Sequence, residues 1–548
     1  MSLVIAIATA DTSWFTVLRG YLLTSGVDEA ALPSRPLTSG TAVGNWLMDG
    51  TPGLLVLDAG IPVEQRRRRD DGSTLAARDI LERLNGSSAA VLVVTSSPSA
   101  ASALESICAE LDNALILPVE KLQRHRENIL RPFLAILTDS TGSNTFGSSF
   151  RIVEAELQSN KVEVRLGVGG GAPMLDWNTV MNLDDLKQAA RLYDTVEDPF
   201  ASIHQGVWPG VQPPKNWLET LRVVGRTLFR VLVVDAVGSH LFSKIESAAG
   251  GLEGMSFRFV INHSGFFSAP FEASVRYLQS EEEGPFVLLY APLVRQVPLP
   301  VRLRMAPRKA LVPPGATVLF VRSQMGEFPN APRKWMNYEG IAFDKLGNVD
   351  RELQHLQDLE EAGRIQLEVA NLSEAAPGKA AEMLLDTVNK IKPIVLHYAG
   401  HAWSDGRNTA TLILPGATPD EAMGLKLDRI AAYEGLSDTK LVYLSACRGI
   451  TKGSVQQMVM HGIPYALGFR WSVEDSRAPE FAKAFYEELC RRHSVPHAFR
   501  RACRASWERL GRDDESPIWI SPILLAQAAD WAAHDDPPSC PSEVLLTA

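Results

Sequence analysis

Two short stretches decide the fold of this chain, IVLHYAGHAW at residues 394–403 and LVYLSACRGI at residues 441–450. Each begins as an apolar run suited to a buried parallel strand and ends in a reactive side chain beside a glycine. The reactive residues, His401 and Cys447, are 447 − 401 = 46 positions apart, as expected when one crossover joins two neighbouring parallel strands. Because chemistry in open α/β sheets gathers outside the carboxyl ends of the strands, this pair predicts a cysteine-dependent active site.

The composition is typical of a globular protein with several domains. The 548 residues are too many for one compact core, and 45% of them are hydrophobic and 22% charged. A net charge of −10 gives no general attraction for phosphate backbones or anionic lipid, so we expect no direct nucleic-acid contact and no membrane contact. No apolar segment approaches the roughly 20 residues that span a bilayer.

The five cysteines are few, odd in number and widely spaced, which argues against a disulfide framework and against a metal site. We therefore expect a reducing, cytoplasmic location, no metal and no cofactor. Cys490, Cys503 and His493 lie on charged helical stretches without ligand spacing, so we interpret them as structural.

Residues 1–138 alternate strand-like and helix-like patterns, an order that predicts a parallel α/β domain. This region resembles a response-regulator receiver domain with a flavodoxin-like fold, in which Asp58 would be the phospho-acceptor and Thr95 the hydroxyl after the fourth strand. Only Asp11 stands where receivers carry an acidic pair, and Leu117 replaces their lysine, so we expect a degenerate, non-phosphorylated sensor or docking domain. The alternative is that Asp58 simply caps a turn.

A Ser-, Thr- and Gly-rich stretch at residues 139–149 predicts a linker. The tail at residues 532–548, which contains DDPPSCPS, is expected to be disordered.

The segment SACRG at residues 445–449 differs from the caspase signature Q-A-C-R-G only at its first position, and caspases also carry their histidine about 50 residues upstream. A Pro-aromatic-Glu motif stands at residues 270–272, with Arg295 after a Leu-rich strand. With YAGH and GFRWSVED added, the pattern resembles the CHAT family of caspase-like proteins over roughly residues 150–529.

This resemblance implies a caspase-like α/β fold with an inactive N-terminal half at residues 150–309 and a catalytic half at residues 310–531. It also implies endopeptidase activity from a His401–Cys447 dyad. The backbone amides of Ala402 and Cys447 would form the oxyanion hole, since an alanine after the histidine still offers an N–H group.

The family's W-x-V-x-D motif would supply the recognition site for the P1 side chain, with Asp475 binding a lysine or arginine. Ser445 replaces a caspase glutamine that helps to bind an acidic P1 residue, which also favours a basic one. Two alternatives remain: Asp475 as the N-cap of the following helix, and Trp403 and Trp471 as core residues. The substrate-binding candidates are Asp475, Glu474, Trp471, Trp403 and Ser445.

Two further residues have structural interpretations. His397 lies inside its apolar run, which favours a core histidine with its hydrogen bonds satisfied. Glu272 is either a helix-start carboxylate or a buried structural group.

These patterns predict a cysteine endopeptidase that cleaves a protein substrate. We expect residues 1–138 to dock an activating or regulatory protein partner, in a bacterial defence or signalling pathway. Two alternatives stay open: a catalytically silent scaffold or adaptor, and a signalling protein controlled by phosphorylation of Asp58.

Overall fold

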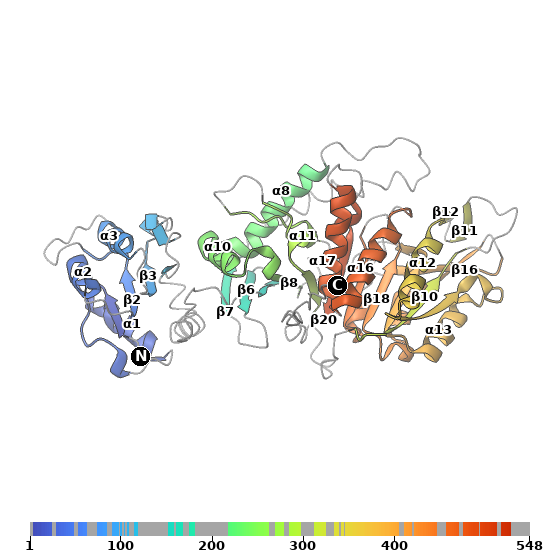
Figure 1. The fold of residues 1–548 in the computed structure, drawn as a ribbon, viewed down its shortest axis with the longest axis horizontal. Coiled ribbons are helices and arrows are strands. Elements are labelled where there is room, and N and C mark those ends of the chain that lie inside the picture. Colours follow the sequence, from blue (N-terminus) through green and yellow to red (C-terminus); the bar gives the residue numbers. More distant parts are fainter. Residues whose placement is uncertain are drawn as a thin grey trace, which may run out of the picture.

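The computed structural model describes most of the 548 residues (Figure 1). The predicted linker at 139–149 and the predicted tail at 532–548 lie outside the described residues. The described ranges are 4–24, 29–48, 53–62, 74–84, 90–97, 99–100, 103–104, 107–108, 114–118, 152–157, 161–167, 175–180, 217–261, 269–278, 284–297, 312–324, 334–338, 341–344, 346–404, 410–418, 421–446, 456–470, 475–492, 494–511 and 517–527.

The first part of the chain forms a parallel four-stranded sheet with helices. Its elements are β1 (Val4–Ala8), α1 (Thr12–Thr24), α2 (Gly40–Met48), β2 (Gly53–Asp58), α3 (Leu75–Arg83), β3 (Ala90–Thr95) and β4 (Ala114–Pro118). The strand order is β1-β2-β3-β4, and Leu37 adds a single parallel bridge to Ala8 on the free edge of β1. That bridge lies where a flavodoxin-like sheet has its second strand. The predicted parallel α/β fold of this region is confirmed.

A second, larger sheet runs through the rest of the molecule. Its strands, in spatial order, are β13 (Gln366–Asn371), β10 (Thr317–Arg322), β14 (Val395–Ala399), β18 (Leu441–Ser445), β19 (Tyr465–Phe469), β20 (Pro522–Gln527), β9 (Leu293–Val297), β8 (Ser256–Ile261), β5 (Ile152–Leu157), β6 (Lys161–Gly167) and β7 (Leu175–Val180). The five strands that come first in sequence lie on one side of the β20–β9 junction, where Leu525 pairs with Arg295, and the six later strands lie on the other.

Helices cover both faces of the later strands. They are α12 (Val349–Glu361), α13 (Ala380–Ile391), α14 (Leu427–Ala431), α15 (Gln456–Met460), α16 (Ala478–Arg492) and α17 (Val495–Ser506). Phe320 and Tyr443 belong to the core that includes α12, α16 and α17, whereas Leu319 and Leu444 belong to the core that includes α13, α14 and α15. Successive residues of β10 and β18 therefore enter opposite cores, which is why the sequences of these two strands are largely apolar.

The earlier half of this region is organised around a buried ion pair. Its helices are α8 (Trp217–Phe229), the π-helical segment η2 (Arg230–Val234), α9 (Asp235–Val237), α10 (Ser239–Ala248) and α11 (Val287–Tyr290). The guanidinium of Arg295 donates from Nε to Glu272 Oε1 at 2.7 Å and from Nη2 to Glu272 Oε2 and to the Ala269 carbonyl. Both charged side chains are almost fully buried. Of the two interpretations of Glu272, the structure supports the buried structural one.

Two small antiparallel units lie beside the later strands. β15 (His401–Ser404), β16 (Ala410–Pro415) and β17 (Ala422–Lys426) form a three-stranded sheet, and β11 (Lys334–Tyr338) pairs with β12 (Ile341–Asp344). Because β15 begins two residues after β14 ends, the chain leaves the large sheet and turns at Gly400.

Candidate active site

The two motif strands are direct neighbours. β14 and β18 pair in parallel with Ala399 opposite Ser445, and the amide of Gly400 donates to the Ser445 carbonyl at 3.2 Å. On the other side of β14, the amide of Ser323 donates to the Ala399 carbonyl at 2.9 Å. The carboxyl ends of β10, β14 and β18 therefore meet at one edge, and the predicted neighbour relation of the two motifs is confirmed.

His401 is held at this edge by its own backbone. Its carbonyl accepts the hydroxyl of Tyr398 at 2.8 Å, and that hydroxyl lies equally close to the carbonyl of Ile413, the strand partner of His401. His401 is 9% exposed, and the centroid of its ring lies 5.0 Å from that of Phe343 on β12. The β11–β12 unit thus reaches the imidazole through Phe343.

Gly400 permits the sharp turn between the strand and the histidine. A Cβ at this position would lie 2.6 Å from the Tyr398 hydroxyl oxygen and 2.8 Å from Ser323 Cβ. Contacts this short would force the backbone to shift, so only glycine fits here. The glycine beside the reactive residue was visible in the sequence, but the crowding that requires it was not.

Cys447 lies outside the described residues, as do Trp471 and Glu474. Ala446, the last described residue of the second motif, is buried and follows the end of β18 directly. In the sequence, Cys447 follows Ala446 and comes two residues after Ser445, whose carbonyl accepts the amide of Gly400. Its role as nucleophile stays a prediction, as do the roles of the Ala402 and Cys447 amides.

Ser445 contacts a buried carboxylate. Its hydroxyl donates to Glu352 Oε2 at 3.0 Å, and both residues are buried, which places the serine side chain against α12. His397 is fully buried, with Nδ1 3.0 Å from the Tyr486 hydroxyl and Nε2 3.1 Å from Glu352 Oε1. His397 thus belongs to the core, as predicted. Its hydrogen bonds are not all satisfied, however, because Nε2 has no hydrogen-bond partner among the described residues. Glu352 carries no sequence signal beyond being an acidic residue on an apolar helix face.

Asp475 is bound to the start of α12. Its Oδ2 accepts the amides of Gly347 and Asn348 at 2.7 and 3.0 Å and the Asn348 side-chain amide at 2.9 Å. One alternative from the sequence was that Asp475 caps the helix that follows it, whereas these bonds serve a helix more than a hundred residues earlier. Trp403 is half-buried on β15, opposite Thr411. Substrate binding by either residue stays a prediction.

Comparison with protein families gives a match to the CHAT domain over residues 224–534. This range covers more than half of the 548-residue chain. The chain belongs to the CHAT family. The resemblance seen in the motifs is therefore confirmed, and CHAT membership supports a function of the cysteine-protease type.

Solved structures and curated proteins add little to the CHAT assignment. Two crystal structures of the Saccharomyces cerevisiae separase–securin complex match at 10% identity with TM-scores of 0.31 and 0.32, covering 79% of this chain and 35% and 34% of those chains. Caspase-1 from Spodoptera frugiperda matches at 11% identity with a TM-score of 0.26, covering 40% of this chain and 88% of that one. The chain spans about a third of the separase chain. No curated protein gives a significant match.

Two tyrosines lie against the ring of His397 in the CHAT region. The ring centroids of Tyr443 and Tyr486 lie 4.4 and 5.6 Å from that of His397. Burial, and next the charge of Glu352, raises the pKa of both tyrosine hydroxyls well above the ordinary value. Both hydroxyls are therefore neutral at physiological pH, and neither can serve as a general base there.

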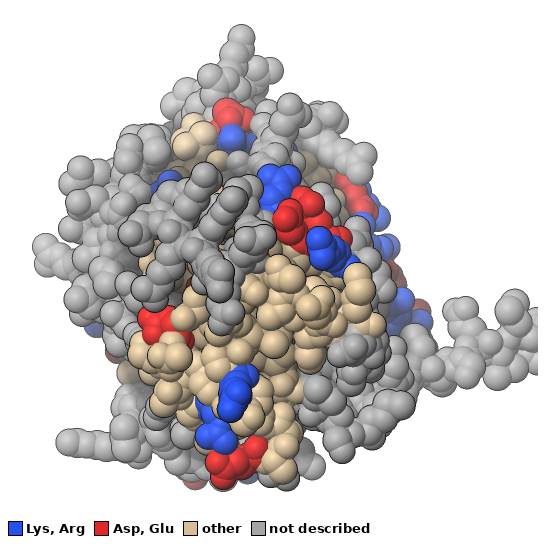
Figure 2. Space-filling view, turned by 90° about the vertical axis from the view of Figure 1, so that its left-hand side faces the viewer, with Lys and Arg blue, Asp and Glu red and all other residues tan. Residues whose placement is uncertain are grey.

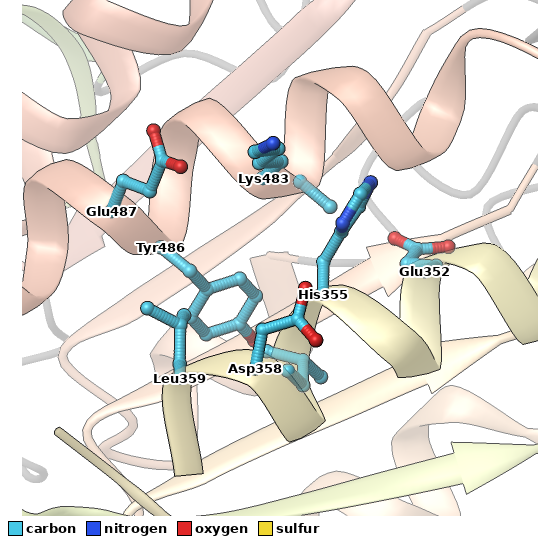
Figure 3. A pocket seen from close by; sticks show the side chains of 9 residues that line it. Glu352, His355, Asp358, Leu359, Lys483, Tyr486 and Glu487 are labelled. Atoms are coloured by element: carbon cyan, nitrogen blue, oxygen red, sulfur yellow. The ribbon is translucent and has the colours of Figure 1, made fainter. Parts of the chain in front are cut away.

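A pocket of about 150 Å³ lies between α12 and α16 of the CHAT region (Figure 3). Glu352 and Tyr486 line it together with His355, whose pKa is lowered, first by burial and then by the charge of Lys483. Glu352, whose carboxylate accepts the Ser445 hydroxyl, lines this pocket on the face of the sheet that α12 and α16 cover. It offers room for a few water molecules.

The two carboxylates of the predicted receiver site, Asp58 and Asp11, accept hydrogen bonds from nearby groups of the N-terminal domain. Asp58 accepts the Thr9 hydroxyl and the Gly60 amide, both at 2.9 Å, and Asp11 accepts the Ser13 amide at 2.8 Å in the first turn of α1. Within the described ranges no cluster of acidic, histidine or cysteine residues could hold a metal ion. These contacts agree with the turn-capping alternative for Asp58.

The described helices were also compared with the length and apolarity that a membrane span needs. None of them meets both requirements.

Proposed function

We propose that the chain is a cysteine endopeptidase of the caspase-like type, with Cys447 as nucleophile and His401 as general base. The observation that carries this proposal is the hydrogen bond from Gly400 to Ser445 at the paired ends of β14 and β18. It ties the residue before His401 to the residue two before Cys447. Nucleophilic catalysis by cysteine needs a base close to the thiol, and side chains at adjacent strand ends can come that close.

In the proposed reaction the Cys447 thiolate attacks a peptide carbonyl after His401 has taken the thiol proton. The amides of Ala402 and Cys447 stabilise the oxyanion of the tetrahedral intermediate. The C–N bond then breaks as His401 gives its proton to the leaving amine, and water hydrolyses the thioester. The hydroxyl of Tyr398 on the His401 carbonyl holds the base in place, because it fixes the backbone from which the ring projects.

Asp475 is proposed to select a basic P1 residue, with Glu474, Trp471 and Trp403 beside it. Three N–H groups of Gly347 and Asn348 donate to Oδ2 and hold the carboxylate in place. A guanidinium or ammonium group would bind at Oδ1 as a charge-assisted partner. Asp475→Asn should then remove the preference for Lys or Arg at P1 in a peptide library, and an unchanged preference would refute this role.

Residues 1–138 are proposed to dock an activating or regulatory protein in a bacterial defence or signalling pathway. The side shown in Figure 2 has a broad area without charged side chains. The N-terminal domain also exposes apolar side chains on its helices, Met48 at 84% and Val17 at 38%. Five widely spaced cysteines suit a reducing cytoplasm.

The decisive experiment compares the full chain with Cys447→Ala in a proteome-scale cleavage profile. Cleavage sites should appear with the wild type and disappear in the variant. Cys490→Ala serves as a matched control, because Cys490 is half-buried on α16 and burial raises its thiol pKa. Cleavage that persists in Cys447→Ala would overturn the assignment.

A further inference from the structure

Glu352 is a buried carboxylate with few partners. It is 2% exposed on α12, its Oε2 accepts the hydroxyl of Ser445, and its Oε1 lies 3.1 Å from His397 Nε2. That second contact is off the line of a hydrogen bond, and within the described residues neither Oε1 nor Nε2 has another hydrogen-bond partner. Figure 3 shows Glu352 on the α12 side of the pocket, near His355.

Glu272, another buried carboxylate, differs from Glu352 in its partners. Glu272 is matched by the guanidinium of Arg295, which donates to both of its oxygens. Taking a carboxylate out of water is costly unless charge and hydrogen bonds compensate for it. The burial of the Glu352 carboxylate is compensated less well. A contribution to stability therefore does not explain why a glutamate stands at this position. Among the described residues, its one well-formed hydrogen bond is to Ser445.

Ser445 is the residue through which Glu352 can reach the reaction. Its hydroxyl is fixed by Glu352 while its carbonyl accepts the amide of Gly400, next to His401. Cys447 follows two residues later. Ser445 therefore contacts both strand ends of the dyad, and its side chain is bound by Glu352 on α12.

The same helix also carries the Asp475 contact. Gly347 and Asn348, at the start of α12, donate to Asp475, and Glu352 lies about one turn further along. The first turn of α12 and the residues just before it thus contact both Ser445, two residues before Cys447, and Asp475, four residues after Trp471.

We propose that Glu352 is a positioning residue, which sets the orientation of the Cys447 segment by fixing the hydroxyl of Ser445. This inference rests on the proposed protease function. Loss of the contact should lower kcat and leave KM unchanged, because Glu352 and Ser445 reach the reaction through Cys447 and His401. A misplacement of the nucleophile by about 1 Å can cost on the order of a hundredfold in rate.

The test uses Ser445→Ala, Glu352→Ala and their combination in the full chain. Each single variant should lower kcat by about ten- to a hundredfold, and the double variant should be no worse than either single one. Glu352→Gln should recover most of the loss, since its amide oxygen can still accept from Ser445. Additive losses, or unchanged kcat in Ser445→Ala, would overturn the proposal.

A second readout separates this proposal from the protease assignment. The rate of Cys447 alkylation by iodoacetamide, followed by mass spectrometry, needs no peptide cleavage and depends on the thiolate. If the wild type cleaves nothing but its Cys447 reacts quickly, and slowly in Ser445→Ala, the positioning role stands and the protease function fails. If Cys447→Ala abolishes cleavage while Ser445→Ala reacts like wild type, the protease function stands and the positioning role fails.

Thr439→Val is the matched control. The buried Thr439 hydroxyl donates to the Pro393 carbonyl at 2.7 Å, just before the opposite ends of β18 and β14. This variant also loses one buried hydroxyl hydrogen bond, here between the segments that lead into β18 and β14. Its thermal midpoint should fall about as much as that of Ser445→Ala, with alkylation and kcat unchanged. An equal loss of alkylation rate in both variants would reduce Glu352 to a purely structural role.

Discussion

The amide of Gly400 donates to the carbonyl of Ser445 at 3.2 Å, and this bond joins the two strand ends that carry the candidate dyad. It extends the parallel register of β14 and β18 by one residue beyond the last strand pair, Ala399 with Ser445. The spacing between His401 and Cys447 therefore depends on backbone geometry at this junction, and the first prediction addresses it.

Gly400→Ala should inactivate the protein while leaving it folded. The added methyl group would sit 2.6 Å from the Tyr398 oxygen, so the backbone before His401 has to move, at a cost of about 1–3 kcal/mol for overpacking. Cleavage and the Cys447 alkylation rate should both fall. Gly20→Ala, in a helix with open space around the site, should change neither rate; wild-type cleavage by Gly400→Ala would refute the steric argument.

Tyr398→Phe should weaken the support of His401. Burial keeps the pKa of this hydroxyl above its ordinary value, so it stays protonated and donates toward the His401 and Ile413 carbonyls at any physiological pH. Leaving a buried acceptor unpaired costs about 1–3 kcal/mol, measurable by urea unfolding, and kcat should fall with it. Tyr433→Phe, on the half-buried surface of the same core, is the control and should behave like wild type.

Breaking the Glu272–Arg295 pair should be the most destabilising of these changes. Glu272→Ala leaves a guanidinium buried without its carboxylate, for an expected loss of about 3–5 kcal/mol in urea unfolding. Glu219→Ala removes one partner of an exposed pair with Arg226 and should cost less than about 1 kcal/mol. Equal losses in the two variants would show that burial of the first pair has no energetic consequence.

Thiol labelling should distinguish an active dyad from a silent scaffold. Cys108 and Cys503 are fully buried, and burial raises the pKa of the Cys503 thiol well above its ordinary value, so both should resist iodoacetamide in the native protein. Cys447 should react first, and Cys447→Ala should lose this fast phase. Labelling of Cys447 no faster than that of half-buried Cys490 would favour the scaffold.

Acid should destabilise the protein partly through His355. Its folded-state pKa is lowered from 6.5, first by burial and then by the charge of Lys483, so the unfolded chain binds this proton more readily than the folded one. The contribution of His355 is intact above the unfolded pKa and declines as the pH falls through that value. Urea unfolding of His355→Gln should show a shallower loss of stability between pH 7.5 and 5.5, a range of about one unit on either side of the unfolded value. An identical slope in wild type and variant would contradict this.

The sequence by itself determined where the motif strands lie and which residues are candidates for the site. Largely apolar runs before His401 and Cys447 predicted buried parallel strands, because a strand covered on both faces uses mostly apolar residues. The family pattern followed from motifs within single segments, and the match over residues 224–534 agrees with it. Local patterns of this kind can be read without knowing which elements meet.

Only the tertiary structure decided which groups support the strand ends. Asp475 contacts Asn348 across 127 positions, and Ser445 contacts Glu352 across 93. Neither contact has a local signature, since Glu352 looks in sequence like any acidic residue in the first turns of a helix. Its burial depends on α12 lying against β14 and β18. The physical reason is that helix periodicity fixes which residues share a face, whereas packing of the whole sheet fixes what that face touches.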